Sequence, residues 1–174
     1  GSVKADGWTL SGVDVERGST VIYGATGHST VTLPRADFVT ACGNRTLAVV
    51  GTSRNTTRVL DKRLAFVAPG KLPSFLTSAR AVFESPACSP NGQQIAAPQG
   101  TNGGPFDRLR LTLLTSSGKV VRFLSPGGAF GDYLPEWAGA GILFERLPEN
   151  ATVTQLWFIP SGGTARATPL HADG

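Results

Sequence analysis

The chain has 174 residues, of which 40% are hydrophobic and only 16% are charged. This length suits one domain with a substantial core, and the low charge density excludes a long coiled coil or a highly charged helical bundle. The net charge is +4, but the 16 Lys and Arg residues are dispersed along the chain, so no nucleic-acid-binding patch is predicted.

Short β-type runs recur along the chain, each bounded by turn residues. In chain order these runs are Ser19 to Tyr23, Thr30 to Leu33, Thr46 to Val50, Arg63 to Val67, Gln94 to Ala97, Arg108 to Thr115, Lys119 to Leu124, Gly141 to Arg146 and Gln155 to Pro160. Leu109, Leu111 and Leu113 alternate with polar residues, which predicts a strand with one buried face. The predicted class is all-β.

Turn residues separate consecutive strands at four places. Ala25-Thr26-Gly27, Asn91-Gly92, Ser117-Gly118 and Ser161-Gly162-Gly163 each combine glycine with residues that favour tight turns. Strands joined by such short connections pair with their neighbours in sequence, so we predict antiparallel meanders.

The sequence contains an internal repeat. Three segments superimpose when Cys42, Cys88 and Trp137 are taken as equivalent, with spacings of 46 and 49 residues. A period of about 40 to 50 residues with four short strands is typical of a β-propeller blade. We therefore predict one all-β domain of four-stranded antiparallel meanders, with a two-sheet β-sandwich as the alternative. The approximate units are 1–37, 38–83, 84–132 and 133–174.

Two stretches carry a family resemblance. Ser89 to Ala96, which begins Ser-Pro-Asn-Gly, and Asp132 to Trp137 resemble the two halves of the repeat in TolB-like β-propellers, and Leu156 to Gly163 resembles a later strand pair of that repeat. The similarity is clearest over residues 80–168. Asn91 and Cys88 depart from the Asp and Trp that are usual in the family. The resemblance implies an exported protein, in the periplasm, at the cell surface or secreted.

Several residues of the repeat have conformational roles in this interpretation. Pro135 fixes φ before a strand, and the ring of Trp137 is expected to fill the wedge between two blades. Pro90 suits the second position of a turn, and Asn91-Gly92 suits positions that need positive φ.

The two cysteines occupy equivalent sites of neighbouring units. Cys42 and Cys88 form a disulfide between adjacent blades, or they are two buried thiols in the place of the wedge tryptophan. Both alternatives stay open from the sequence. Metal binding is not predicted, because no histidines accompany the cysteines.

No catalytic motif stands out. The sequence has no G-x-S-x-G, P-loop or G-x-G-x-x-G pattern, and His28 and His171 are expected in exposed loops. We predict no active site and no cofactor.

Polar residues near the blade entries are the candidates for recognition. Asp37 and Asp132 each stand five residues before Cys42 and Trp137, and Glu136 is next to Trp137. Phe106 and Asp107 lie in an insertion-like loop.

The favoured function is a non-enzymatic scaffold, part of an exported TolB-like propeller that binds a protein through its loop face. The alternatives are a propeller that gates a peptidase of the prolyl-oligopeptidase type and a carbohydrate-binding propeller.

The length is small for a closed ring. Fewer than four units of this period fit into 174 residues, whereas typical propellers have four to eight blades. Because the sequence has no methionine, even at position 1, we expect an excerpt of a longer propeller. The alternatives are a ring completed by a second copy and the sandwich. No apolar run is long enough to cross a bilayer.

Overall fold

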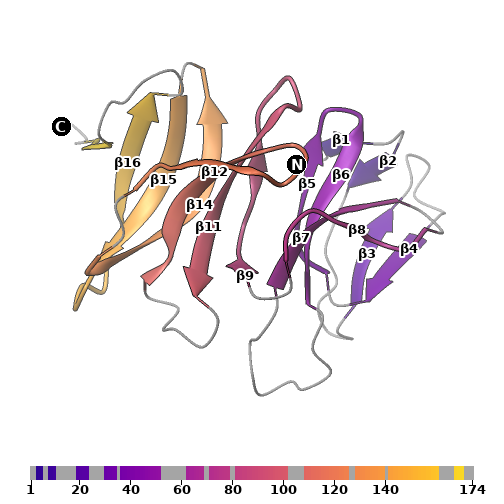
Figure 1. Ribbon diagram of the computed structural model, residues 1–174, viewed down its shortest axis with the longest axis horizontal. Coiled ribbons are helices and arrows are strands. Elements are labelled where there is room, and N and C mark those ends of the chain that lie inside the picture. The colour runs from indigo at the N-terminus through magenta and orange to yellow at the C-terminus, as the bar shows by residue number, and fades with distance from the viewer. Residues whose placement is uncertain are drawn as a thin grey trace.

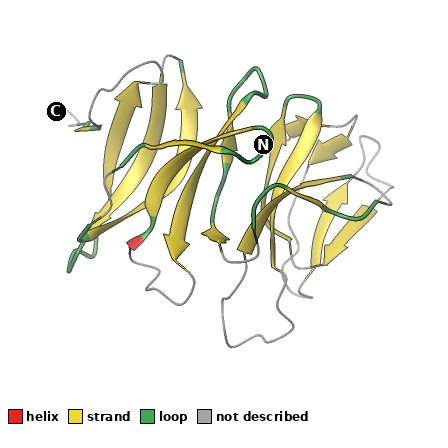
Figure 2. Ribbon diagram, in the orientation of Figure 1, coloured by secondary structure: helices red, strands yellow, loops and turns green. Residues whose placement is uncertain are grey.

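The computed structural model describes residues 3–5, 8–10, 19–23, 30–34, 36–51, 62–68, 71–78, 81–101, 108–125, 128–139, 141–160 and 167–170. Side chains are described from Ala36 onward, except those of Asp37 and Thr101. The regular structure is built of β-strands in antiparallel pairs, so the predicted all-β class is confirmed (Figure 2).

The strands form sheets from elements that are consecutive in the chain. Two hairpins come first: β1 (Val3–Ala5) with β2 (Trp8–Leu10), and β3 (Ser19–Tyr23) with β4 (Thr30–Pro34). The proximal sheet contains β5 (Ala36–Cys42), β6 (Arg45–Gly51), β7 (Lys62–Val67) and β8 (Ser74–Phe75). The central sheet contains β9 (Ala81–Phe83), β10 (Ala87–Cys88), β11 (Gln94–Thr101), β12 (Arg110–Thr115) and β13 (Val120–Phe123). The distal sheet contains β14 (Phe130–Ala138), β15 (Gly141–Pro148), β16 (Gln155–Pro160) and β17 (Thr168–Pro169).

Each of these three sheets is a meander, as the turn residues predict. In the central sheet, β9 and β10 both pair with β11 and act as two halves of one strand that is interrupted at Ser85. The turn between β12 and β13 places Gly118 at φ +86°, and its N–H donates to the Thr115 carbonyl at 2.9 Å. Ala25-Thr26-Gly27 and Ser161-Gly162-Gly163 lie outside the described residues.

The Ser-Pro-Asn-Gly turn differs from the prediction in one respect. Gly92 has φ of +70°, but Asn91 is not among the residues with positive φ. Instead, the Asn91 side-chain oxygen accepts the Gln93 N–H at 3.1 Å, and the Ser89 hydroxyl accepts the Gln94 N–H at 2.9 Å. Asn91 therefore stabilises the turn through its side chain, because a short polar side chain can hydrogen-bond to the backbone nearby.

The three sheets are stacked face to face in a row (Figure 1). Alternate residues of β11 point to opposite faces of the central sheet, so Ile95 and Ala97 pack toward the proximal sheet, whereas Ala96 packs toward the distal sheet. Strand β12 is buried on both faces for the same reason, which corrects the expectation of one buried face. Open sheets stacked in this way fit a partial propeller or a sandwich.

Cys42 and Cys88 form a disulfide between the proximal and central sheets, with their Cα atoms 5.1 Å apart. Strand pairing shows that Cys42 is one residue out of the predicted register: Ala41 pairs with Thr46 in the way that Cys88 pairs with Ile95. A shift of one residue turns a side chain to the other face of a sheet. The Cys42 side chain therefore points toward the central sheet, and the Cys88 side chain points toward the proximal sheet.

Trp137 makes the corresponding contact between the central and distal sheets. Its ring packs against the apolar cluster between these sheets, and its Nε1–H donates to the Ala87 carbonyl at 3.2 Å. A disulfide thus links the proximal and central sheets, and the indole ring of Trp137 fills the corresponding place between the central and distal sheets.

Removing the disulfide should reduce stability. The loop between the two cysteines has a sequence separation of 46, so the double variant Cys42→Ala/Cys88→Ala should lose about 4 kcal/mol of unfolding free energy in the loop-entropy account. Urea unfolding of the variant and of the oxidised protein measures the difference. A loss below about 1 kcal/mol would contradict a constraining role for this bond.

Candidate functional site

The first strand of each stacked sheet is irregular at one equivalent position. Phe38, Ser85 and Leu134 have φ of +46°, +27° and +46°, values that residues other than glycine rarely adopt. The register of β5 shifts between Asp37 and Val39, that of β14 shifts at Leu134, and Ser85 separates β9 from β10. The three sheets therefore share a bulge that bends the strand at the same place.

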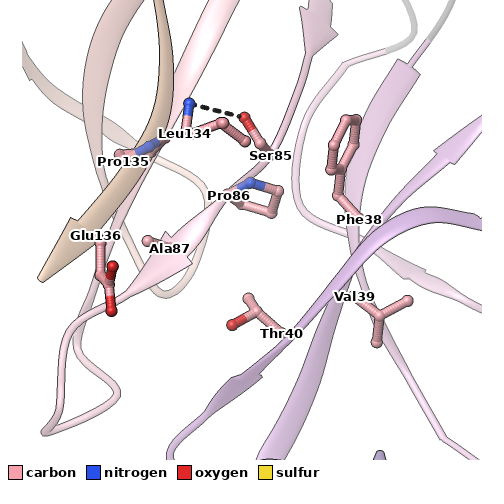
Figure 3. A pocket seen from close by; sticks show the side chains of 9 residues that line it. All are labelled: Phe38, Val39, Thr40, Ser85, Pro86, Ala87, Leu134, Pro135 and Glu136. Atoms are coloured by element: carbon pink, nitrogen blue, oxygen red, sulfur yellow. Dashed lines mark hydrogen bonds between the residues drawn. The ribbon is translucent and has the colours of Figure 1, made fainter. Parts of the chain in front are cut away.

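The three bulges open onto one cavity of about 370 Å³ (Figure 3). Each sheet contributes three consecutive residues, beginning with the one at positive φ. The lining residues are Phe38, Val39, Thr40, Ser85, Pro86, Ala87, Leu134, Pro135 and Glu136. Because strained backbone often marks functional sites, three such residues around one cavity make it the candidate binding site.

Local chemistry explains how the bulges are tolerated. A bulge leaves backbone groups outside the sheet ladder, and each of these groups needs a hydrogen-bond partner. The Leu134 N–H donates to the buried Ser85 hydroxyl at 3.3 Å, which joins two of the bulges. Pro86 follows Ser85, and Pro135 follows Leu134. Because proline has no backbone N–H, neither position adds a donor that needs a hydrogen-bond partner.

One end of the pocket is apolar. Phe38 and Leu134 are 40% and 53% exposed, which is high for large apolar side chains. The Lys62 ammonium lies 5.9 Å from the centre of the Phe38 ring and forms an ion pair with Glu84 at 3.4 Å. The cation beside Phe38 is thus already neutralised by a carboxylate.

The other end of the pocket is polar. Figure 3 shows Thr40 and Glu136 two residues along their strands from Phe38 and Leu134. The Glu136 side chain is exposed and makes no hydrogen bond or ion pair with any described residue. The pocket therefore offers a negative charge at one end and an apolar surface at the other.

Asp132 does not lie in an exposed loop. It is 0% exposed within β14, and its two carboxylate oxygens accept from Arg146 Nε at 2.7 Å and Nη2 at 3.0 Å. Its equivalent in the proximal sheet is Ala36, since Ala36 pairs with Val50 as Asp132 pairs with Arg146. The predicted equivalence of Asp37 and Asp132 is therefore wrong by one residue.

The remaining sequence candidates differ in where they fall. Glu136 lines the pocket. The backbone of Asp37 pairs with Val49, but the Asp37 side chain is outside the described part of the structure. Four further candidates lie wholly outside the described residues: Phe106, Asp107, His28 and His171.

Sequence reasoning missed Phe38, Ser85 and Leu134. The prolines at 86 and 135 were the available signal, because proline in a strand often marks a bulge. Phe38 has no such marker.

Within the described ranges, no three His, Cys, Asp or Glu residues are grouped to hold a metal ion. Nor does this part of the chain contain a helix long and apolar enough to cross a membrane. No protein-family model matches the chain, and no curated protein matches it significantly.

The Asp132–Arg146 pair should be structural. Asp132→Ala would leave the Arg146 guanidinium, also buried, without its carboxylate, and should cost about 3 to 5 kcal/mol of unfolding free energy. Glu149→Ala breaks the exposed pair with Arg108 and should cost under about 1 kcal/mol. Thermal or denaturant unfolding compares the two variants, and equal losses would contradict this assignment.

Proposed function

We propose that the chain is a non-enzymatic module of the β-propeller type that binds an extended segment of a partner protein at the pocket between its bulged strands. The observation that supports this function most is the convergence of three equivalent bulges on one cavity. A repeat that places the same strained position of every sheet around one cavity suits recognition.

The pocket favours a particular ligand pattern. Its apolar end and Glu136 lie two residues apart along β14, which is about 7 Å in a strand. In an extended peptide, residues i and i+2 point to the same side and have this same spacing. We therefore expect an apolar residue near Phe38 and Leu134, and a Lys or Arg two positions away at Glu136.

The disulfide supports an exported location. Disulfides form and persist in oxidising compartments, and they are rare in the cytosol. Together with the stacked meanders, this supports the proposal of a TolB-like propeller segment in the periplasm, at the cell surface or in secreted form.

A carbohydrate site has less support. Among the described residues that line this pocket, Phe38 is the only aromatic one, whereas Trp137 and Trp157 pack against the cluster between the central and distal sheets. No observation on the described residues favours the peptidase-gating alternative over a binding module.

The test is a binding screen of extended peptides against the 174-residue protein. A peptide with an apolar residue and a Lys at i and i+2 should bind, and Glu136→Gln should weaken it about tenfold or more, because hydrogen bonds to charged groups contribute about 1.5 to 3 kcal/mol. Phe38→Ser should weaken binding as well.

Glu149→Gln is the matched control, since it removes an exposed carboxylate that does not line the pocket. Its affinity should equal that of the unchanged protein. Affinities that respond equally to Glu136→Gln and Glu149→Gln, or a peptide footprint away from the pocket, would refute the proposed function.

A further inference from the structure

The width of the pocket depends on contacts between sheets. Its walls come from the first strands of the proximal, central and distal sheets. Strand β10 contacts β5 on one side and β14 on the other. Within the described ranges no backbone ladder joins β10 to either of these strands. Whatever holds the sheets against one another therefore fixes the distance across the pocket.

The polar end of the pocket has an acceptor on each outer wall. Thr40 of the proximal sheet, Ala87 of the central sheet and Glu136 of the distal sheet are the last lining residue of their strands (Figure 3). The Thr40 hydroxyl, like the Glu136 carboxylate, makes no hydrogen bond with any described residue. A Lys ammonium has three donors, so one bound here can donate to both oxygens.

The disulfide lies next to the proximal wall of this end. Cys88 directly follows Ala87, and Cys42 stands two residues after Thr40. Pairing with β6 is regular from Val39 to Cys42, so the Thr40 and Cys42 side chains point to the same side of β5. The disulfide therefore holds the strand that carries Thr40 against the strand that carries Ala87.

The junction around the disulfide is tight. A Cβ atom at Gly92 would lie 3.1 Å from both Cα and N of Gly43, so the two hairpin turns are in close backbone contact. The Cys42 sulfur lies 3.9 Å from the Gly92 carbonyl oxygen. Two thiol sulfur atoms keep a van der Waals separation, whereas bonded sulfur atoms do not. Opening the disulfide therefore pushes the two strands apart where space is already limited.

The distal wall of the polar end is held without the disulfide. Trp137 directly follows Glu136, and its Nε1–H donates to the Ala87 carbonyl at 3.2 Å. Glu136 therefore keeps its place relative to the central sheet when the disulfide opens.

The apolar end also has contacts of its own. Lys62 of the proximal sheet forms its ion pair with Glu84, which directly precedes Ser85 of the central sheet. The Ser85 hydroxyl accepts the Leu134 N–H of the distal sheet. Neither contact includes a cysteine, so opening the disulfide should affect the polar end more than the apolar end.

We propose that the Cys42–Cys88 disulfide sets the ligand preference of the pocket and acts through Thr40. The inference rests on the proposed function. With the bond closed, Thr40 and Glu136 both receive the cationic side chain of the ligand. With the bond open, Thr40 moves away from Glu136, and the preference for Lys or Arg falls while apolar recognition persists.

A dithiol opens the bond by a balanced exchange. Its thiolate attacks one sulfur to form a mixed disulfide, and its second thiolate then displaces the protein sulfur. Cys42 and Cys88 become thiols, and the dithiol is oxidised to its own disulfide in a two-electron step.

Peptide titrations of the 174-residue protein before and after treatment with dithiothreitol test the proposal. One peptide carries an apolar residue and Lys at i and i+2, and the other has norleucine in place of Lys. Reduction should lower the ratio of the two affinities about tenfold, as expected for one lost hydrogen bond to a charged group. A smaller folded fraction weakens both peptides by the same factor, so the ratio reports position rather than stability.

Thr40→Val should lower the same ratio about tenfold in the oxidised protein, and reduction of this variant should lower it no further, because the two changes remove one interaction. This variant is measured with the disulfide intact, so it decides the question even where the reduced protein unfolds. Cys42→Ala/Cys88→Ala is the matched control for the reductant, because the chain has only these two cysteines. Dithiothreitol should leave its affinities unchanged.

A ratio that survives reduction of the folded protein overturns the inference, as does a ratio that survives Thr40→Val or one that falls with dithiothreitol in the cysteine-free variant. If the oxidised protein prefers the Lys peptide but does not respond to reduction, the proposed function stands and only this inference fails. An oxidised protein that binds neither peptide refutes both.

Discussion

The face-to-face burial of the central sheet is the constraint on which the rest of the structure depends. Its strands alternate like any others, but both of their faces are apolar, so Ile95 contributes to one core and Ala96 to the next. A sheet buried on both sides sets the position of its two neighbours, since each must bring an apolar face of matching shape. The stacking therefore determines where the first strands of the three sheets meet.

The pocket is a consequence of this stacking. Bulges at Phe38, Ser85 and Leu134 would be unrelated irregularities on isolated hairpins, but stacked sheets bring equivalent positions side by side. The hydrogen bond from Leu134 N–H to Ser85 shows the coupling directly, because the backbone of one sheet is satisfied by a side chain of the next. The contacts that hold neighbouring sheets together therefore also shape the pocket.

Contacts between neighbouring strands of the same sheet explain several charged residues. Arg146 is held by Asp132 and lies over the Phe130 ring, with the cation 3.9 Å from the ring centre. Arg63 and Arg110 lie over Phe75 and Phe123 on the last strands of their sheets, at 3.8 and 3.4 Å. Cation–π contacts of this kind place guanidinium groups on aromatic faces, which accounts for part of the dispersed positive charge without a nucleic-acid ligand.

The sequence by itself determined the elements. Short β-type runs bounded by turn residues predicted the strands from Thr46 to Val50 and from Gln155 to Pro160, together with the meander order, because these signals act over a few neighbouring residues. Tertiary structure alone decided the register and the site. The bulge at Phe38 has no marker in the sequence. Strand pairing also places Ala41 where the sequence alignment placed Cys42, and Ala36 where it placed Asp37. A shift of one residue reverses the direction of every side chain in a strand, and only the packing of one sheet on the next selects between the two directions.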